Sequence, residues 1–173
     1  MFVCETHIPH SVAAKKKEKE KLLRFLSESA QRRSKLDKLE LVDLVKYDAD
    51  DETTVVGRGA FGKVVKGFLH GQAVAIKVLT HFDRQAMAKF EAEALLMSEL
   101  KHTHIIQLLG VVLKSDHPGL VVEFASNGTL RSVLQNKEFQ LSWHEPKLRW
   151  AQEIAKGGAY LHGHSYFDEF KLG

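Results

Sequence analysis

Three glycines in the stretch VVGRGAFGKVV, residues 55–65, have the spacing that most clearly permits chemistry. Gly57, Gly59 and Gly62 follow the pattern G-x-G-x-x-G. Because glycine has no side chain, such a turn lets the backbone lie close over a phosphate and point its N–H groups at it. Phe61, at the tip of the turn, would shield such a site from water. The stretch therefore predicts a nucleotide site.

The residues after these glycines argue against a dinucleotide-binding fold. In that fold the glycines end a strand and begin a helix, and an acidic residue follows about 20 residues later. Here Gly62 is followed by KVVKGF, a valine-rich run that predicts a strand. We therefore interpret the glycines as a turn between two antiparallel strands that covers phosphates.

Lys77 is the second residue with chemical potential. It lies in the apolar stretch VAIK, where an ammonium group is costly unless it is paired. By itself the pattern also fits an alternating strand with the lysine on its wet face. The helix predicted next offers Glu91 and Glu93 as carboxylate partners. A lysine held by either carboxylate and facing the glycine turn would clamp a phosphate.

The ten histidines and the basic run do not predict further sites. The pairs HTH at 102–104 and HGH at 162–164 have no cysteine or carboxylate cluster to complete a metal site. The run KKKEKEK has interleaved glutamates and no stacking aromatics, which is typical of a solvated helix. We expect no metal site and no nucleic-acid partner.

Length and charge pattern divide the chain into two parts. Its 173 residues, 44% hydrophobic and 27% charged, suit one globular domain with an extension. Residues 1–50 are dense in lysine and glutamate and predict a charged helical extension, with a surface for a partner or a membrane as the alternative to a solvated helix. The acidic stretch DADDETT is a turn-forming boundary, and residues 51–173 form the domain.

The domain has a regular order of predicted elements. Valine-rich runs at 53–57, 63–68 and 72–79 predict three strands, with His70-Gly71 as a hairpin turn. A run free of glycine and proline predicts a helix over 82–102 that Asp83 caps. Two more strands follow at 105–113 and 120–124. We expect a short helix that Ser126-Asn127 caps, and a longer helix over 144–162.

Cysteine content and hydropathy indicate the compartment. Cys4 is the only cysteine, and no apolar run reaches the roughly 18 residues of a membrane span. The net charge of +3 suits an anionic ligand without selecting one. We expect a cytoplasmic location and no membrane span.

Several of these segments together resemble the protein kinases. GRGAFGKV and VAIK resemble the glycine-rich loop and the third-strand lysine. The αC helix and fourth strand of the kinases resemble FEAEALLMSELKHTHIIQLLGVV. Their fifth strand, hinge and helix D resemble GLVVEFASNGTLRSVL, and their helix E resembles LRWAQEIAKGGAYLH. In style the chain is closest to the tyrosine-kinase-like group of serine/threonine kinases. The resemblance implies an α+β fold: a kinase N-lobe with a five-stranded antiparallel sheet and αC, then the first C-lobe helices.

The resemblance also implies roles for individual residues in binding ATP. Gly57, Gly59 and Gly62 would cover the phosphates, Lys77 would contact the α- and β-phosphates, and Glu93 would pair with that lysine. The adenine pocket would be lined by Val56, Val64 and Ala75, with Val122 as gatekeeper and the backbones of Glu123 and Ala125 on the adenine edge.

The catalytic segments of the family do not occur in this sequence. It contains no H-R-D loop and no D-F-G segment, and Asp168 lacks the preceding His-Arg of a catalytic base. We therefore expect the ATP-binding part of a kinase that phosphorylates serine or threonine, with tyrosine as an alternative acceptor. As a fragment or a short form it would be inactive alone, would bind ATP weakly and would need Mg²⁺ only when complete. The alternative is a non-catalytic regulatory module that contacts a protein partner through the αC face around Met97 and Leu100. We also expect the apolar stripe of helix E, with Trp150, Ile154 and Leu161, to be exposed.

Overall fold

The computed structural model covers the 173-residue chain and describes residues 10–41, 43–59, 62–80, 83–136, 138 and 141–163. Four residues considered above, Cys4, Phe61, His164 and Asp168, lie outside the described residues. The chain forms two compact units, Met1–Lys38 and Leu39–Gly173. Each unit is best understood by itself.

The first unit contains one long helix, α1 (His10–Asp37). Ion pairs at a spacing of four residues run along it, Arg24 with Glu28 at 3.5 Å and Arg33 with Asp37 at 3.8 Å. Such pairs on a helix surface each stabilise it modestly. A charged helix was predicted in this region, and α1 is that helix. Among the described residues, no helix combines the length and the apolar character that crossing a membrane requires.

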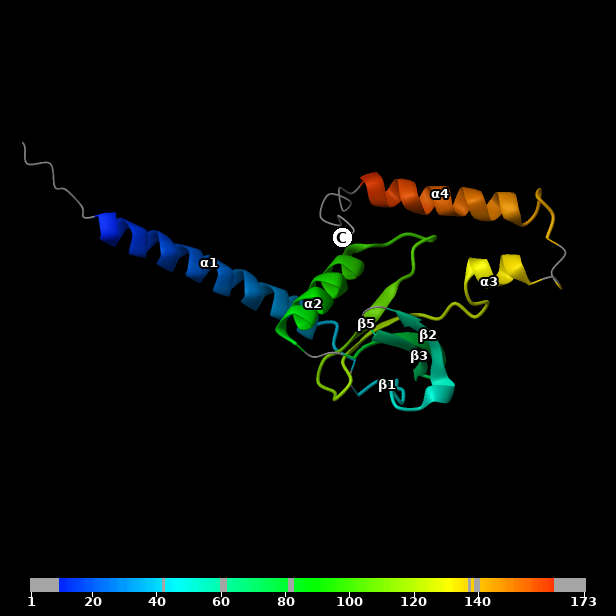
Figure 1. The fold of residues 1–173 in the computed structure, drawn as a ribbon, viewed down its shortest axis with the longest axis horizontal. Helices are drawn as coiled ribbons and strands as arrows, with labels where there is room; N and C mark the ends of the chain where they lie inside the picture. The colour runs from blue at the N-terminus through cyan, green and yellow to red at the C-terminus, as the bar shows by residue number, and fades with distance from the viewer. Residues whose placement is uncertain are drawn as a thin grey trace, which may run out of the picture. The chain divides into compact units, whose positions relative to one another are not determined.

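The second unit is built on an antiparallel sheet (Figure 1). Its strands, as far as the residues are described, are β1 (Val45–Lys46), β2 (Val55–Gly59), β3 (Gly62–Leu69), β4 (Gln72–Leu79), β5 (Leu108–Val112) and β6 (Gly119–Glu123). The order across the sheet is β1-β3-β4-β6-β5, and β2 pairs with β3. The five predicted strands are confirmed as β2–β6, and β1 is an addition from the segment before them. The unit also contains a short 3₁₀ turn, η1 (Glu52–Thr54), and the helices α2 (Arg84–Glu99), α3 (Leu130–Gln135) and α4 (Lys147–Gly163).

The turn between β3 and β4 follows its sequence signal. Leu69 pairs with Gln72, so His70 and Gly71 form a two-residue hairpin loop. Both have positive φ, 50° and 81°. This is the geometry in which the twist of a two-residue turn matches that of its strands. The hairpin predicted here is confirmed.

Helix α2 begins as its sequence predicts and contributes to the core. The Asp83 carboxylate accepts a hydrogen bond from the Ala86 amide at 2.7 Å, which caps the first turn. Phe90 and Ala94 on this helix are buried. Leu100, the residue after the helix, is only 7% exposed. Leu100 therefore belongs to the core, and its proposed place on a partner-binding surface is wrong.

The cap of α3 differs from the prediction. Thr129 precedes the helix, and its side chain accepts a hydrogen bond from the Ser132 amide at 3.0 Å. The predicted cap, Ser126-Asn127, lies instead in a turn that closes with a bond from the Gly128 amide to the Ala125 carbonyl. Gly128 has a φ of 72°, which a glycine adopts without strain. Because Ser126 and Asn127 lie in this turn, the helix begins after Thr129, the next residue whose side chain can cap it.

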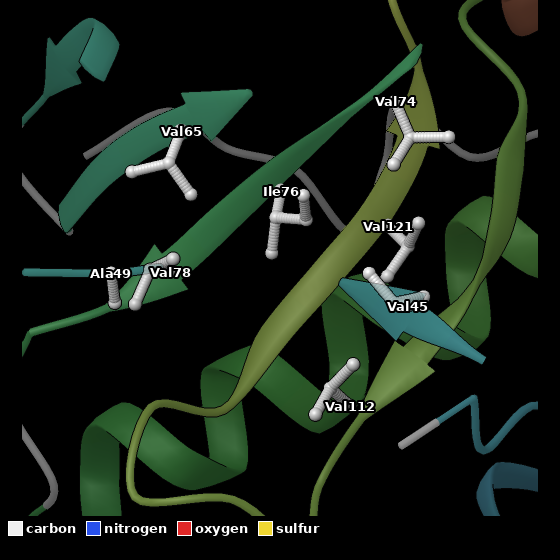
Figure 2. Packing of buried hydrophobic residues seen from close by; sticks show 8 residues of the cluster. All are labelled: Val45, Ala49, Val65, Val74, Ile76, Val78, Val112 and Val121. Carbon is white, nitrogen blue, oxygen red and sulfur yellow. The ribbon is translucent and has the colours of Figure 1, made fainter. Parts of the chain in front are cut away.

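One face of the sheet carries a core of small branched residues. The cluster consists of Val45, Ala49, Val65, Val74, Ile76, Val78, Val112 and Val121 (Figure 2). Four of them alternate along β3 and β4, so they share one face of the sheet. Val45 and Ala49 come from the segment before β2 and complete the cluster.

We call residues 39–50 the strap, because this segment joins two edges of the sheet. At one end it lies along β5, with bonds of 2.8 Å from the Leu41 amide to the Val111 carbonyl and from the Val111 amide to the Leu39 carbonyl. At the other end it forms β1 and pairs with β3. Covering sheet edges in this way satisfies their exposed polar groups. These residues were expected in the helical extension, but Val45 and Ala49 are buried in the core instead, while Leu44 is exposed.

Two glycines mark the points where the strap passes closest to the sheet. A Cβ atom on Gly110 would lie 2.6 Å from the Leu39 carbonyl oxygen, and one on Gly67 would lie 2.8 Å from the Lys46 carbonyl oxygen. Neither distance is tolerable without moving backbone. The glycines therefore permit the strap to pack directly on the strands.

The strap is also tied to the turn between β5 and β6. The Tyr47 hydroxyl donates to the His117 carbonyl, and burial raises the pKa of this phenol above its ordinary value. His117 Nε2 lies 3.4 Å from the Asp50 carboxylate. A hollow of about 500 Å³ here is lined by strap residues 45–49 with Val112, Ser115 and His117. None of the predicted site residues lines it.

Helix α4 docks on the segment that precedes β5. The Lys101 amide donates to the Tyr160 hydroxyl at 3.0 Å, and the Tyr160 ring stacks on His102 with centroids 4.8 Å apart. Gly157 is buried against the His104 backbone. Ile154 is 59% exposed, as expected for the apolar stripe. Trp150 and Leu161 are half-buried, so the expectation of exposure is wrong for them.

The adjacent glycines of α4 predict opposite effects of the same substitution. Alanine at either position improves helix propensity by about 1 kcal/mol. At Gly157, however, the new Cβ would lie 2.9 Å from the His104 carbonyl oxygen, whereas at Gly158 it meets nothing within 4 Å. We expect Gly158→Ala to stabilise the chain, and Gly157→Ala to destabilise it by about 1–2 kcal/mol net.

The measurement is urea unfolding followed by the fluorescence of Trp143 and Trp150, which lie before and within α4. Gly158→Ala is the matched control for Gly157→Ala. Equal midpoints for the two variants would show that α4 does not dock through Gly157.

Candidate functional site

Strand register places four of the predicted site residues on the sheet face opposite the core cluster. Val64 pairs with Lys77, and Ala75 pairs with Val122. Directly opposed residues in an antiparallel pair point to the same side, and alternate residues along a strand do too. These four side chains therefore share one face, while Val65, Ile76 and Val121 lie on the other.

Lys77 and Glu93 form the central ion pair of this face. Lys77 Nζ lies 2.6 Å from one carboxylate oxygen of Glu93 and 2.8 Å from the other. The side chains are 37% and 35% exposed, so the pair is partly withdrawn from water. A charge-assisted contact to both oxygens is stronger and more directional than an ordinary surface pair. The pairing predicted between these residues is present.

Packing of α2 explains why Glu93, and not Glu91, holds the lysine. Phe90 and Ala94 are buried and thus define the inner side of the helix. At about 100° of rotation per residue, Glu91 and Glu93 lie on opposite flanks of this buried stripe, and the flank of Glu93 faces β4, where its carboxylate meets Lys77. Glu91 is two residues earlier and points to another side of the helix.

Strands β2 and β3 form the glycine hairpin, which carries the three glycines. Its register is Gly57 with Val64 and Gly59 with Gly62. The register shifts between Val55 and Gly57, which makes Val56 an extra residue of a bulge. Val55 packs against the core cluster, whereas Val56 is 52% exposed. The bulge thus turns Val56 away from the core.

The fold requires glycine at one of the three glycine positions but not at the other two. Gly62 has a φ of 151°, and a Cβ there would run into the Val78 carbonyl. The fold itself therefore requires Gly62. A Cβ on Gly59 would meet nothing within 4 Å, and one on Gly57 would make only an ordinary contact with Val64. Packing does not explain these two glycines, and the open space beside them suits a ligand that approaches the backbone.

At the end of β6 and just after it, part of the backbone already makes hydrogen bonds within the chain. The Glu123 amide donates to the Gln107 carbonyl at 3.2 Å, and the Glu123 carboxylate accepts from the Gln107 amide at 2.9 Å. The Ala125 carbonyl accepts from the Gly128 amide at 3.1 Å. Since the Glu123 amide is committed to Gln107, its carbonyl and the Ala125 amide are the better candidates for contacts with a ligand.

Sequence reasoning missed one contact beside this segment. Lys66 Nζ lies 5.2 Å from the ring centroid of Phe124 and 5.8 Å from that of Phe68. These distances are typical of cation–π attraction. Lys66 pairs with Ala75 and so lies on the site face. The alternation of KVVKGF could have indicated that face, but not the aromatic partner from a distant segment.

Two other expectations concern metals and Phe61. Within the described ranges, no three histidine, cysteine or acidic side chains come together as they would around a metal ion. Phe61, expected at the tip of the glycine hairpin, lies outside the described residues.

Comparison with known proteins identifies the family. Residues 51–167 match the family of protein tyrosine and serine/threonine kinases. Cysteine-rich receptor-like protein kinase 45 of Arabidopsis thaliana is 38% identical over 127 residues, 72% of this chain and 36% of the relative. Wall-associated receptor kinase 4 of Arabidopsis thaliana is 41% identical over 118 residues, covering 66% and 16% of the two chains. Cysteine-rich receptor-like protein kinase 6 of Oryza sativa subsp. japonica is 35% identical over 123 residues, covering 68% and 18%.

The antiparallel sheet, the ion pair between Lys77 and Glu93 and the match to the family model all indicate the same class of protein. The chain is part of a protein kinase domain and contains its N-lobe, its hinge and the first helices of its C-lobe. The chain belongs to the protein tyrosine and serine/threonine kinase family. It spans about a third or less of the length of these curated relatives. The family in general uses ATP and Mg²⁺.

The contrast between the glycines predicts a difference in stability. Gly62→Ala forces an unfavourable backbone conformation and a clash with the Val78 carbonyl, so we expect a loss of about 2–3 kcal/mol. Gly59→Ala, in the same hairpin, should change stability by less than about 1 kcal/mol because its Cβ meets open space. Thermal unfolding of both variants measures the difference. Equal destabilisation would mean that the hairpin geometry described here is incorrect.

Proposed function

We propose that this chain supplies the ATP-binding part of a protein kinase that transfers the γ-phosphoryl group of ATP to serine or threonine hydroxyls of proteins. The observation that carries the proposal is the contact of Lys77 with both carboxylate oxygens of Glu93, on the face beside the glycine hairpin. Serine and threonine are favoured as acceptors because the similar Arabidopsis protein At2g19230 is described as a putative receptor-like serine/threonine-protein kinase.

The phosphates of ATP would lie between Lys77 and the glycine hairpin. Lys77 would contact the α- and β-phosphates as an ammonium donor while Glu93 holds its side chain in place. Fixing the lysine in advance lowers the entropy lost when the nucleotide binds. Gly57 and Gly59 would let the backbone approach the phosphates, since neither position is filled by the chain itself.

The adenine ring would lie farther along the same face, toward the segment after β6. It would contact the apolar side chains of Val56, Val64 and Ala75, with Val122 at the back of the pocket. The Glu123 carbonyl would accept from the adenine amino group, and the Ala125 amide would donate to a ring nitrogen. The hydrogen bonds described for Glu123 leave these groups as the suitable pair.

Magnesium has no assigned ligands among these residues. In protein kinases the ion is held by the D-F-G aspartate and the catalytic-loop asparagine, and neither segment occurs in this sequence. We therefore assign this chain the binding and orientation of ATP. Phosphoryl transfer is proposed for the whole kinase, with catalytic residues outside these 173. Because ATP is the substrate, we propose a cytoplasmic location for this domain.

Titration of the 173-residue chain with ATP tests this function. Lys77→Met removes the ammonium group but retains an unbranched apolar side chain. Since a hydrogen bond to a charged group contributes roughly 1.5–3 kcal/mol, we expect affinity to fall about ten-fold or more. Glu93→Gln should weaken binding less, because the lysine remains but is no longer held by a charge.

The matched control is Lys114→Met, which removes one positive charge from the exposed turn between β5 and β6. It should bind ATP as the unaltered chain does. If Lys77→Met and Lys114→Met respond to ATP equally, Lys77 is not a phosphate ligand and the proposed function loses its main support.

A further inference from the structure

Glu52 contacts both strands of the glycine hairpin from one position. Its carboxylate accepts a hydrogen bond from the Arg58 guanidinium, and its other oxygen lies 3.4 Å from Lys63 Nζ. Arg58 and Lys63 are directly opposed residues of β2 and β3. A single carboxylate thus bridges the two strands at the pair next to Gly59 and Gly62.

This cluster of three charges lies on the sheet face opposite the proposed ATP site. Lys63 pairs with Val78 of the core cluster, whereas its neighbour Val64 pairs with Lys77 on the site face. The Lys63 side chain is 15% exposed, so its stem is packed and its ammonium group reaches only a limited volume. Glu52 therefore acts on the hairpin from its outer side, without touching the site.

The turn that carries Glu52 is itself held firmly. Asp51 caps η1 by accepting hydrogen bonds from the amide and hydroxyl of Thr53, and these bonds lower the pKa of its carboxyl. The Asp48 side chain accepts from the amides of Asp50 and Asp51 at 2.9 and 3.2 Å. The acidic stretch we expected only to be a domain boundary is an ordered support for the Glu52 side chain.

We propose that Glu52 is a positioning residue that clamps the two strands of the glycine hairpin, so that its backbone stays in place over the phosphates of ATP. The inference rests on the proposed function. Exposed ion pairs are individually weak and are screened by salt. A clamp of this strength would hold the hairpin yet allow it to move when nucleotide enters and leaves.

Removing the charge of Glu52 has opposite effects on ATP affinity, depending on whether Glu52 positions the hairpin or acts only through its charge. Neutralising Glu52 leaves two cations near the proposed phosphate site without that carboxylate, and by Coulomb attraction alone this would strengthen ATP binding. Loss of positioning would weaken it. The sign of the change in affinity therefore separates the two roles.

The first experiment measures amide hydrogen exchange of residues 57–65 in the chain without nucleotide. We expect Glu52→Gln to speed exchange in the hairpin about two- to five-fold, as the loss of a weak ion pair implies. Asp116→Asn, which removes the same charge from the exposed β5–β6 turn, is the control and should leave the hairpin unchanged. Unchanged exchange in Glu52→Gln would overturn the clamp.

The second experiment compares binding of ATP and adenosine. Glu52→Gln should weaken ATP binding about two- to five-fold and leave adenosine unaffected, because only ATP has phosphates for the hairpin to cover. The double variant Glu52→Arg with Arg58→Glu keeps the total charge and restores an opposite-charge pair, so it should recover most of the ATP affinity. Tighter ATP binding by Glu52→Gln, or no recovery by the double variant, would contradict positioning.

The two measurements also separate this inference from the proposed function. If the unaltered chain does not respond to ATP, the proposed function fails. In that case the exchange experiment still decides whether Glu52 clamps the hairpin, because it uses no nucleotide.

Discussion

A charged lysine in the central part of a buried sheet is the constraint on which this domain depends. Lys77 can occupy β4 only because the sheet presents it to one side while the valines of the same strand enter the core on the other. Its ammonium group then needs a carboxylate, which α2 supplies as Glu93. The ion pair therefore links the register of the sheet to the rotation of the helix.

One face of the sheet packs into the core, and the other carries the proposed binding site. The face with the core cluster is completed by the strap, which joins β5 to β3 and needs Gly67 and Gly110 for its close approach. The other face carries the residues proposed to bind ATP. Because Val45 and Ala49 of the strap lie in the core but outside the family match at residues 51–167, the strap is part of the folded lobe.

The glycine hairpin combines residues that the fold requires with residues that leave space for a ligand. Gly62 is imposed by backbone geometry, while Gly57 and Gly59 leave space that packing does not use. The bulge at Val56 turns an apolar side chain out of the core. Glu52 braces the hairpin from its outer face.

The sequence by itself determined the element order, the β3–β4 hairpin and the Asp83 cap, because these follow from local signals and from periods of two and 3.6 residues. The choice of Glu93 over Glu91 came from the resemblance to the protein kinases. Only the tertiary structure decided where distant segments meet. The strap was missed because its apolar residues lie next to a charged helix and have no strong strand pattern. The close approach of Gly157 to the His104 carbonyl joins segments far apart in the sequence. The Glu52 bridge joins side chains from a turn and two strands, and no sequence period relates such residues, because their proximity comes from pairing and packing.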